Sequence, residues 1–285
     1  MPAKKSRQTQ NLFNIKRSAE KMNTLKAMYF CFIMLLLLMI SCSSEKKNEA
    51  EKQAGTTETA EATTADVEAT SGPKATITGT VTFAGAVPKL QLISMDAEPA
   101  CAAKHTEPVR SQALVLGPGN ALANVFVKVK SGLPQKTYPP PKEPVVIDQD
   151  GCLYSPHVFG VMVGQPLKIL NSDGILHNIH PHPKINRAFN IAMPKTLKET
   201  QRTFKKVEED LFPIKCDVHP WMQAFMCVMP HPFYSVTQKD GKYTISGLPP
   251  GTYEIEAWHE KMGTRTASVT VAEGETKTLD FTFKR

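Results

Sequence analysis

A thiol, an imidazole and a thioether lie close together in one short stretch of this sequence. Cys216, His219 and Met222 follow one another with the spacing C-x2-H-x2-M. A thiolate combined with imidazoles favours copper, and a weakly bound axial thioether is typical of copper electron-transfer sites. Such a site needs a second imidazole, and His177 is well placed to supply it. The sequence therefore predicts a mononuclear copper site with His177, Cys216, His219 and Met222 as its ligands.

The residues around these four resemble the cupredoxins, the blue copper proteins. The resemblance rests on the compressed Cys, His-Pro-aromatic and Met loop of residues 216–222 and on the N-x-D-x3-H-N pattern of residues 171–178. It points to amicyanin- and plastocyanin-like members of that family. It implies a Greek-key β-sandwich that carries single electrons through one type 1 copper. Pro220 and Trp221 would then form an apolar lip beside His219, at which a redox protein partner could dock.

Polar and aromatic residues flank the expected ligands. Asp173 and Asn178 are expected to fix the ligand loops by hydrogen bonds to the backbone. The full set expected around the ligands is Asn171, Asp173, Asn178, Pro220 and Trp221. His180 and His182 have two interpretations: they are exposed imidazoles near the site, or they form a secondary metal-capturing or proton-linked element.

The cysteines outside the ligand loop suggest a disulfide. The chain has six cysteines, and in an exported protein a pair outside a metal loop more often forms a disulfide than anything else. Cys101 and Cys152 are therefore the candidate pair. A second metal site is the alternative, because His105 and His157 each follow one of these cysteines closely. Cys227 is expected to pack as a small buried hydrophobic residue.

The first 42 residues predict export. Basic residues precede the apolar run 27–40, which ends at Ser41 and Cys42, and this order is typical of a secretory signal. The run is shorter than the ~20 residues that a membrane span requires. Cys42 resembles the acylated cysteine of bacterial lipoproteins, which implies attachment to a lipid bilayer. Simple cleavage to a soluble secreted protein is the alternative.

Residues 43–74 are rich in Glu, Lys, Ala and Thr and have almost no large apolar side chain. Such a composition cannot bury enough surface to offset chain entropy, so a disordered linker is predicted. We expect a periplasmic or outer-membrane-attached bacterial lipoprotein whose folded part begins at residue 75.

The positive charge of the chain belongs mainly to the leader. Seven of the 34 Lys and Arg residues and one of the 27 acidic residues lie in residues 1–42, which leaves a net charge of +1 for the remainder. A near-neutral chain lacks the basic surface that binding to nucleic acid requires. Nucleic acid is therefore not an expected partner.

Short alternating segments separated by Gly and Pro predict an all-β fold after residue 75. Residues 76–83 and 125–129 alternate apolar and polar side chains, and residues 144–147 form a short apolar run. We expect a cupredoxin-like domain over residues 75–235, with its core at about 144–232. Residues 212–216 and 224–229 would be the strands that enter and leave the ligand loop.

A second pattern lies at the C-terminal end. Two alternating segments flank Pro249-Pro250-Gly251, a turn sequence. Residues 236–285 thereby resemble the carboxypeptidase regulatory-like domain, which implies a smaller prealbumin-like β-sandwich. Residues 76–83 resemble the first strand of the same family. The two domains would follow one another, or the first strand would complete the second domain across the cupredoxin-like one.

These features predict an exported electron carrier rather than an enzyme. A multicopper enzyme needs further histidine-rich centres, whereas the eight histidines of this chain are scattered outside the predicted site. A dinuclear copper centre needs a second cysteine where Pro220 stands. The alternative function is a non-catalytic envelope binding or scaffold module, which would bind carbohydrate or store copper.

Overall fold

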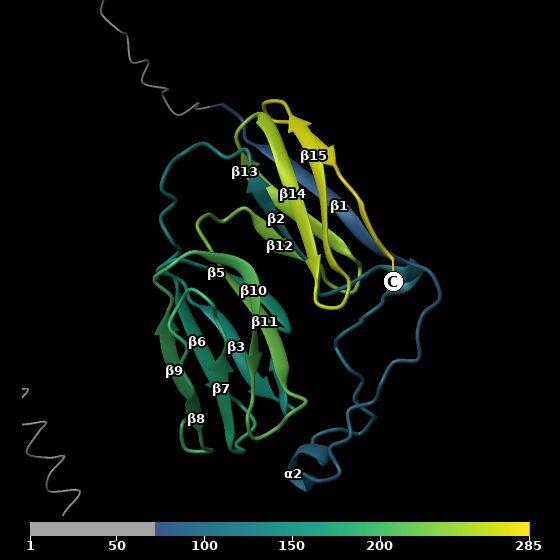
Figure 1. Ribbon diagram of the computed structural model, residues 1–285, viewed down its shortest axis with the longest axis vertical. Helices are drawn as coiled ribbons and strands as arrows, with labels where there is room; N and C mark the ends of the chain where they lie inside the picture. Colours follow the sequence, from purple (N-terminus) through teal and green to yellow (C-terminus); the bar gives the residue numbers. More distant parts are fainter. Residues whose placement is uncertain (1–71, 285) are drawn as a thin grey trace, which may run out of the picture. The chain divides into compact units, whose positions relative to one another are not determined.

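The computed structural model of the chain describes residues 72–284, whose regular secondary structure is almost entirely β-strand (Figure 1). Among these residues there is one short α-helix, α2 (Pro99–Ala102), and one 3-10 turn, η1 (Pro118–Asn120). No helix in this part of the chain has the length and apolar character needed to cross a membrane. The expected all-β class is confirmed. The predicted signal segment, Cys42 and nearly all of the predicted linker lie outside the described residues.

The strands follow one another closely along the chain, with short turns between most of them. In order they are β1 (Ala75–Ala84), β2 (Phe126–Ser131), β3 (Val145–Asp150), β4 (Leu153–Ser155), β5 (Val158–Met162), β6 (Pro166–Asn171), β7 (His177–Pro181), β8 (Ile191–Met193), β9 (Glu199–Thr203), β10 (Glu208–Lys215), β11 (Gln223–Met229), β12 (Tyr234–Val236), β13 (Lys242–Leu248), β14 (Gly251–His259), β15 (Gly263–Val271), β16 (Thr276–Thr278) and β17 (Phe281–Lys284).

Strands β3 to β11 form two sheets, which we call the central sandwich. One sheet has the order β5-β11-β10-β7-β8 and the other has the order β4-β3-β6-β9. Their inward side chains, such as Leu167, Ile169 and Ile214, pack into one core. Because β7 and β10 are antiparallel neighbours, the start of β7 and the end of β10 lie at the same end of their sheet. His177 and Cys216 are thus brought to one end of the central sandwich.

The remaining strands form the terminal sandwich. Its sheets are β13-β1-β16, with β17 also paired to β1, and β12-β2-β14-β15. Buried side chains of β1 alternate strictly with partly exposed ones, and Ile77 and Val81 pack against Tyr253 and Phe283 from the C-terminal strands. In Figure 1, the blue strand β1 accordingly lies with the yellow-green strands β13, β14 and β15.

The strand pairing differs from a simple succession of two domains. β1 pairs with β13, β16 and β17, and β2 pairs with β12 and β14. Both strands precede the central sandwich in sequence, although the expected cupredoxin-like segment of residues 75–235 would include them. We propose that the domain of the C-terminal strands is interrupted by the central sandwich, because β1 and β2 occupy inner positions in its two sheets.

A loop between β1 and β2 packs on the central sandwich; we call residues 91–111 the cap loop. Its ends are joined by backbone hydrogen bonds from Ser111 to Gln91 and from Ile93 to Val109. Met95 and Cys101 of this loop are buried in the core cluster of the central sandwich. The cap loop therefore contributes to a core whose strands begin only at residue 145.

Candidate metal centre

Two imidazoles and a thiol converge at one end of the central sandwich. The Nδ1 atoms of His177 and His219 are 2.9 Å apart, and the Cys216 Sγ lies 3.7 Å from the His219 Nδ1. One ligand atom from each of these residues lies within 4.8 Å of the others, and all three residues are buried. The structure thus brings together three of the four residues that the sequence proposed as copper ligands.

A tight loop positions Cys216, His219 and Met222. Cys216 follows β10 directly, and β11 begins one residue after Met222. The Cys216 N–H donates to the Met222 carbonyl at 3.2 Å, and the Met222 N–H donates to the His219 carbonyl at 2.9 Å. Met222 is fully buried in the same core cluster as Cys216. The backbone therefore folds the loop back on itself and holds its three side chains at the end of the sandwich.

The spacing of these atoms fits a metal ion. Imidazole nitrogens bind a first-row divalent ion at ~2.0 Å and thiolate sulfur binds it at ~2.3 Å. Two nitrogens 2.9 Å apart and a sulfur 3.7 Å from one of them can therefore share one ion. The combination of a thiolate with imidazoles selects copper or zinc from the biological metals. The residues present fit a single mononuclear centre.

Asp173 orients His177 toward this centre. The His177 Nε2–H donates to the Asp173 Oδ2 at 2.8 Å, which leaves Nδ1 to face the other ligands. Burial opposes ionisation of Asp173, but hydrogen bonds from His177, Lys104 and the backbone N–H groups of Cys152 and Gly151 lower its pKa to about 2. The ionised carboxylate therefore fixes both the ring orientation and the tautomer of His177.

The acid–base properties of the three converging groups suit metal ligation. Burial works against the thiolate, but hydrogen bonds from His177 and from the loop backbone lower the pKa of Cys216. Burial and the neighbouring His177 lower the pKa of His219, which favours its neutral ring. For His177, burial is outweighed by hydrogen bonds to Asp173 and Cys216, so its pKa is raised. A metal ion must displace a proton from any protonated ligand, so binding would release protons.

Asn178 organises the first residues of the ligand loop. Its Oδ1 accepts hydrogen bonds from the Cys216 thiol at 3.3 Å and from the backbone N–H groups of Asp217 at 2.6 Å and Val218 at 3.3 Å. Its Nδ2 donates to the Asn190 Oδ1 at 2.6 Å. Asn178 thus reaches both the sulfur and the backbone, and it connects the start of β7 to the loop after β10.

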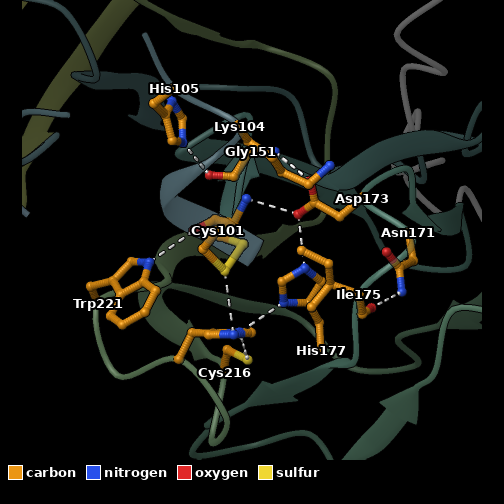
Figure 2. The surroundings of a disulfide bond; sticks show 12 residues. Cys101, Lys104, His105, Gly151, Asn171, Asp173, Ile175, His177, Cys216 and Trp221 are labelled. Carbon is orange, nitrogen blue, oxygen red and sulfur yellow. Dashed lines mark hydrogen bonds and ion pairs between the residues drawn. A yellow bond between two sulfur atoms is a disulfide. The ribbon is translucent and has the colours of Figure 1, made fainter. Parts of the chain in front are cut away.

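The cap loop covers the other side of His219. The Cys101–Cys152 disulfide joins the cap loop to the β3–β4 turn, and the Cys101 Sγ lies 3.5 Å from the His219 Nε2. Figure 2 shows Cys101 between Trp221 and His177, with Asp173 bonded to the far edge of the His177 ring. The indole N–H of Trp221 donates to the Cys152 carbonyl at 3.0 Å, and its ring centroid lies 5.1 Å from that of His219.

The other residues predicted to surround the ligands have separate roles. Asn171 lies in β6, and its Nδ2 donates to the carbonyls of Ile175 and Met193, both at 2.8 Å. It therefore closes the turn that leads to His177. Pro220 is exposed, whereas Trp221 is half-buried and donates to the Cys152 carbonyl of the β3–β4 turn. The predicted apolar lip thus has one exposed member and one that packs inward.

His180 and His182 stack on each other outside the centre, with ring centroids 4.1 Å apart. The His180 Nδ1 lies 3.2 Å from the Asp217 carboxylate, and neither histidine belongs to a cluster of three potential metal ligands within the described residues. The alternative metal site around Cys101 and Cys152 has no such cluster with His105 or His157 there either. His105 bonds to the Gly151 carbonyl, and His157 bonds to Glu260.

Sequence reasoning missed the contacts that the cap loop makes with the site. Lys104 forms an ion pair with Asp173, with Nζ 2.9 Å from Oδ1, and Cys101 contacts His219 across 118 positions of sequence. No local sequence pattern predicts either contact. The proximity of Lys104 to Cys101 in sequence was the one available signal, because a residue three positions from a disulfide cysteine must lie near whatever the disulfide covers.

Comparisons with known proteins give partial matches. The family described as the carboxypeptidase regulatory-like domain matches residues 230–284. No curated protein sequence matches the chain. Among solved structures, a variant of amicyanin in its oxidised state is 21% identical, and the match covers 36% of this chain and 98% of amicyanin with a TM-score of 0.27.

Two further solved structures illustrate the range of these matches. A purple cupredoxin from Nitrosopumilus maritimus is 23% identical, and the match covers 30% of this chain and 99% of that protein with a TM-score of 0.25. A copper-containing nitrite reductase from Thermus scotoductus is 19% identical with a TM-score of 0.28, and the match covers 30% of this chain but only 22% of the reductase. The chain is thus similar to cupredoxins over about a third of its length and to the carboxypeptidase regulatory-like domain at its C-terminal end.

Proposed function

We propose that this protein is an exported type 1 (blue) copper protein that carries single electrons in the cell envelope. The observation that supports the proposal best is the convergence of the His177 Nδ1, the His219 Nδ1 and the Cys216 Sγ in a buried cluster. Met222, which is buried in the same core cluster, would be the weak axial ligand. A single copper bound there would supply one-electron redox chemistry.

The surrounding residues suit a rigid electron carrier. Asp173 fixes the ring of His177, and Asn178 fixes the backbone next to Cys216. The hydrogen bond from the Met222 N–H to the His219 carbonyl fixes the loop between these two residues. Electron transfer is fast when ligand positions change little between oxidation states. A donor set held by hydrogen bonds to a β-framework meets that requirement, which favours an electron carrier over an enzyme.

The proposal extends to the location of the protein and its partners. The predicted signal sequence and Cys42 favour a lipoprotein of the periplasm or outer membrane, anchored to the bilayer by an acyl group on Cys42. Residues 43–74 would tether the folded part. The electron partner would be another redox protein of the cell envelope.

The proposal predicts a coloured protein with one copper per chain. In the oxidised protein, thiolate ligation should give an intense visible charge-transfer band, and Cys216→Ser should abolish that band because a hydroxyl is a poor soft ligand. Metal analysis and visible absorption of the purified protein test this. Cys227→Ser is the matched control, since Cys227 is a second buried free cysteine that lies in a different cluster. A wild-type protein that stays colourless after loading with Cu(II) would refute the proposal.

Copper storage is the second candidate function. One observation favours it: His219 is fully buried, so neither edge of this ligand is open to a docking partner. Electron exchange with a soluble redox mediator separates the two functions. A carrier exchanges electrons rapidly while keeping its copper, whereas a storage protein exchanges them slowly and releases Cu(I) to an acceptor.

A further inference from the structure

His219 has an unusual environment for a ligand on a surface loop. Its neighbours Val218 and Pro220 are exposed, yet His219 itself has no exposed surface. Its Nδ1 faces His177 and Cys216, and its Nε2 faces the Cys101 Sγ at 3.5 Å. The outer edge of the ring therefore meets a disulfide sulfur from the cap loop.

The cap loop is held in this position by three contacts of its own, and a fourth contact joins the ligand loop to the turn that carries Cys152. The disulfide joins Cys101 to Cys152, and the Lys104 Nζ lies 2.9 Å from the Asp173 Oδ1. The His105 ring bonds to the Gly151 carbonyl at 2.8 Å. From the ligand loop, Trp221 donates to the Cys152 carbonyl. Figure 2 shows these contacts arranged around the disulfide.

The turn that carries Cys152 is also connected to His177. The N–H groups of Gly151 and Cys152 donate to the two carboxylate oxygens of Asp173 at 2.7 and 2.8 Å. Asp173 in turn accepts from the His177 Nε2. The Cys101–Cys152 unit thus touches His219 directly and His177 through one carboxylate.

We propose that the cap loop and its disulfide are positioning elements of the metal centre that exclude external ligands from it. The proposal rests on the proposed copper function. With the cap loop in place, small anions and chelators cannot reach the ligand atoms, so the centre is restricted to electron transfer without ligand exchange. The disulfide is central to this exclusion of external ligands because it is the covalent link between the cap loop and the central sandwich.

The first test uses the metal-free protein and the two free thiols. Cys216 and Cys227 are both buried, but they lie in different core clusters. In Cys101→Ser/Cys152→Ser, labelling by N-ethylmaleimide should increase several-fold at Cys216 and stay unchanged at Cys227. Mass spectrometry of the digested protein measures the two rates separately. Because this test needs no copper, it stands apart from the proposed function.

Cys227 also reports whether the double variant is folded. If both thiols label faster, the variant has unfolded globally, and Trp221→Phe becomes the deciding variant. Phenylalanine retains an aromatic ring and leaves the disulfide intact, but it removes the hydrogen bond to the Cys152 carbonyl. Preferential labelling of Cys216 in Trp221→Phe supports the proposal, and equal labelling of Cys216 in this variant and the wild type overturns it.

The second test uses the copper-loaded protein. Azide should leave the visible spectrum of the wild type unchanged and shift that of the double variant. Bathocuproine disulfonate should capture Cu(I) several-fold faster from the double variant than from the wild type, because the chelator gains access to the ligand atoms. Equal responses of the two proteins would overturn this inference and leave the copper function standing. Absence of copper from the wild type would instead refute the proposed function.

Discussion

Asn178 fixes the first residues of the ligand loop. One amide oxygen accepts three hydrogen bonds, from a thiol and two successive backbone N–H groups. Asn178 and Cys216 are buried, whereas Asp217 and Val218 are exposed, so water could replace the amide oxygen at the two backbone N–H groups but not at the thiol. A fully buried unpaired donor costs about 1–3 kcal/mol, so the cost at these partly buried backbone groups is smaller, but the loop would lose the bonds that fix its first residues.

Removal of this amide should weaken metal binding without removing a ligand. Asn178→Ala is expected to lower the affinity for copper about 10- to 100-fold, while the charge-transfer band of the loaded protein persists. Competition with a chromophoric chelator measures the affinity. Asn190→Ala is the matched control, because Asn190 bonds to Asn178 and Asp217 but not to the cysteine. A larger effect of Asn190→Ala would contradict this role of Asn178.

At the scale of elements, β1 is the strand that holds the terminal sandwich together. It lies between β13 on one side and β16 and β17 on the other. The segment that matches the carboxypeptidase regulatory-like domain, residues 230–284, contains neither β1 nor β2. Each sheet of the terminal sandwich would therefore lose an inner strand if that segment stood alone.

Gly79 allows the strands around β1 to approach closely. A Cβ at this position would lie 1.9 Å from the Leu279 carbonyl oxygen and 2.8 Å from the Tyr243 ring. Gly79→Ala should therefore destabilise the fold by about 1–3 kcal/mol, as expected for overpacking in a buried site. Denaturant unfolding measures the loss.

Gly251→Ala is the matched control for this substitution. Gly251 lies in β14 of the same sandwich, and a Cβ there would meet its nearest atoms at 3.6 Å, which is ordinary contact. Its effect on stability should be small. Similar losses in both variants would mean that the cost arises from strand glycine in general and not from the close approach at Gly79.

At the scale of the whole described chain, the two sandwiches meet at buried titratable groups. The His157 Nε2 of the central sandwich lies 2.7 Å from the Glu260 Oε1, which follows β14. Next to it, His259 is almost fully buried and its Nδ1 accepts from the Lys261 N–H. Burial is the main cause that lowers the pKa of His259 to about 4; His157 and Lys261 lower it further, and Glu260 opposes them.

This shift predicts a stability that decreases in mild acid. The folded protein keeps His259 neutral, whereas the unfolded chain takes up a proton below the ordinary pKa of 6.5. The contribution is therefore complete above pH 6.5 and is lost as the pH falls toward 4, by roughly 3 kcal/mol. Unfolding of the metal-free protein by urea at several pH values measures it.

The comparison with His259→Gln isolates this contribution from those of other groups. The variant cannot take up the proton, so its stability should decrease less than that of the wild type between pH 6.5 and 4. Parallel pH profiles of the two proteins would show that another group carries the dependence.

The sequence predicted the features that local patterns encode. Alternating side chains marked β1, β13 and β14, and the spacing of Cys216, His219 and Met222 marked the ligand loop. The approach of His177 to that loop depended on resemblance to a family, since two segments 39 positions apart carry no local sign of contact.

What the sequence could not predict were contacts set by distant pairing. Cys101 of the cap loop contacts His219, 118 positions away in sequence. The hydrophobic periodicity of a segment does not indicate which surface a loop will cover. Alternation in β1 indicated a half-buried strand but not its partners; only the resemblance of residues 76–83 to a family's first strand offered pairing with the C-terminal strands, as one of two arrangements. The order of strands depends on how much apolar surface all the strands bury together, which the sequence of a single strand does not encode.

The pairing of β1 with β17 has a consequence for the order of folding. Thr82 and Thr282 form a contact between strands separated by 200 positions, and closing so long a loop is entropically costly and slow. The strands of the central sandwich are contiguous in sequence, so it can assemble before the terminal sandwich closes. Cys101 and Cys152 can then pair before β1 finds its partners. The disulfide would shorten the remaining search by fastening the chain after β1 to a folded body.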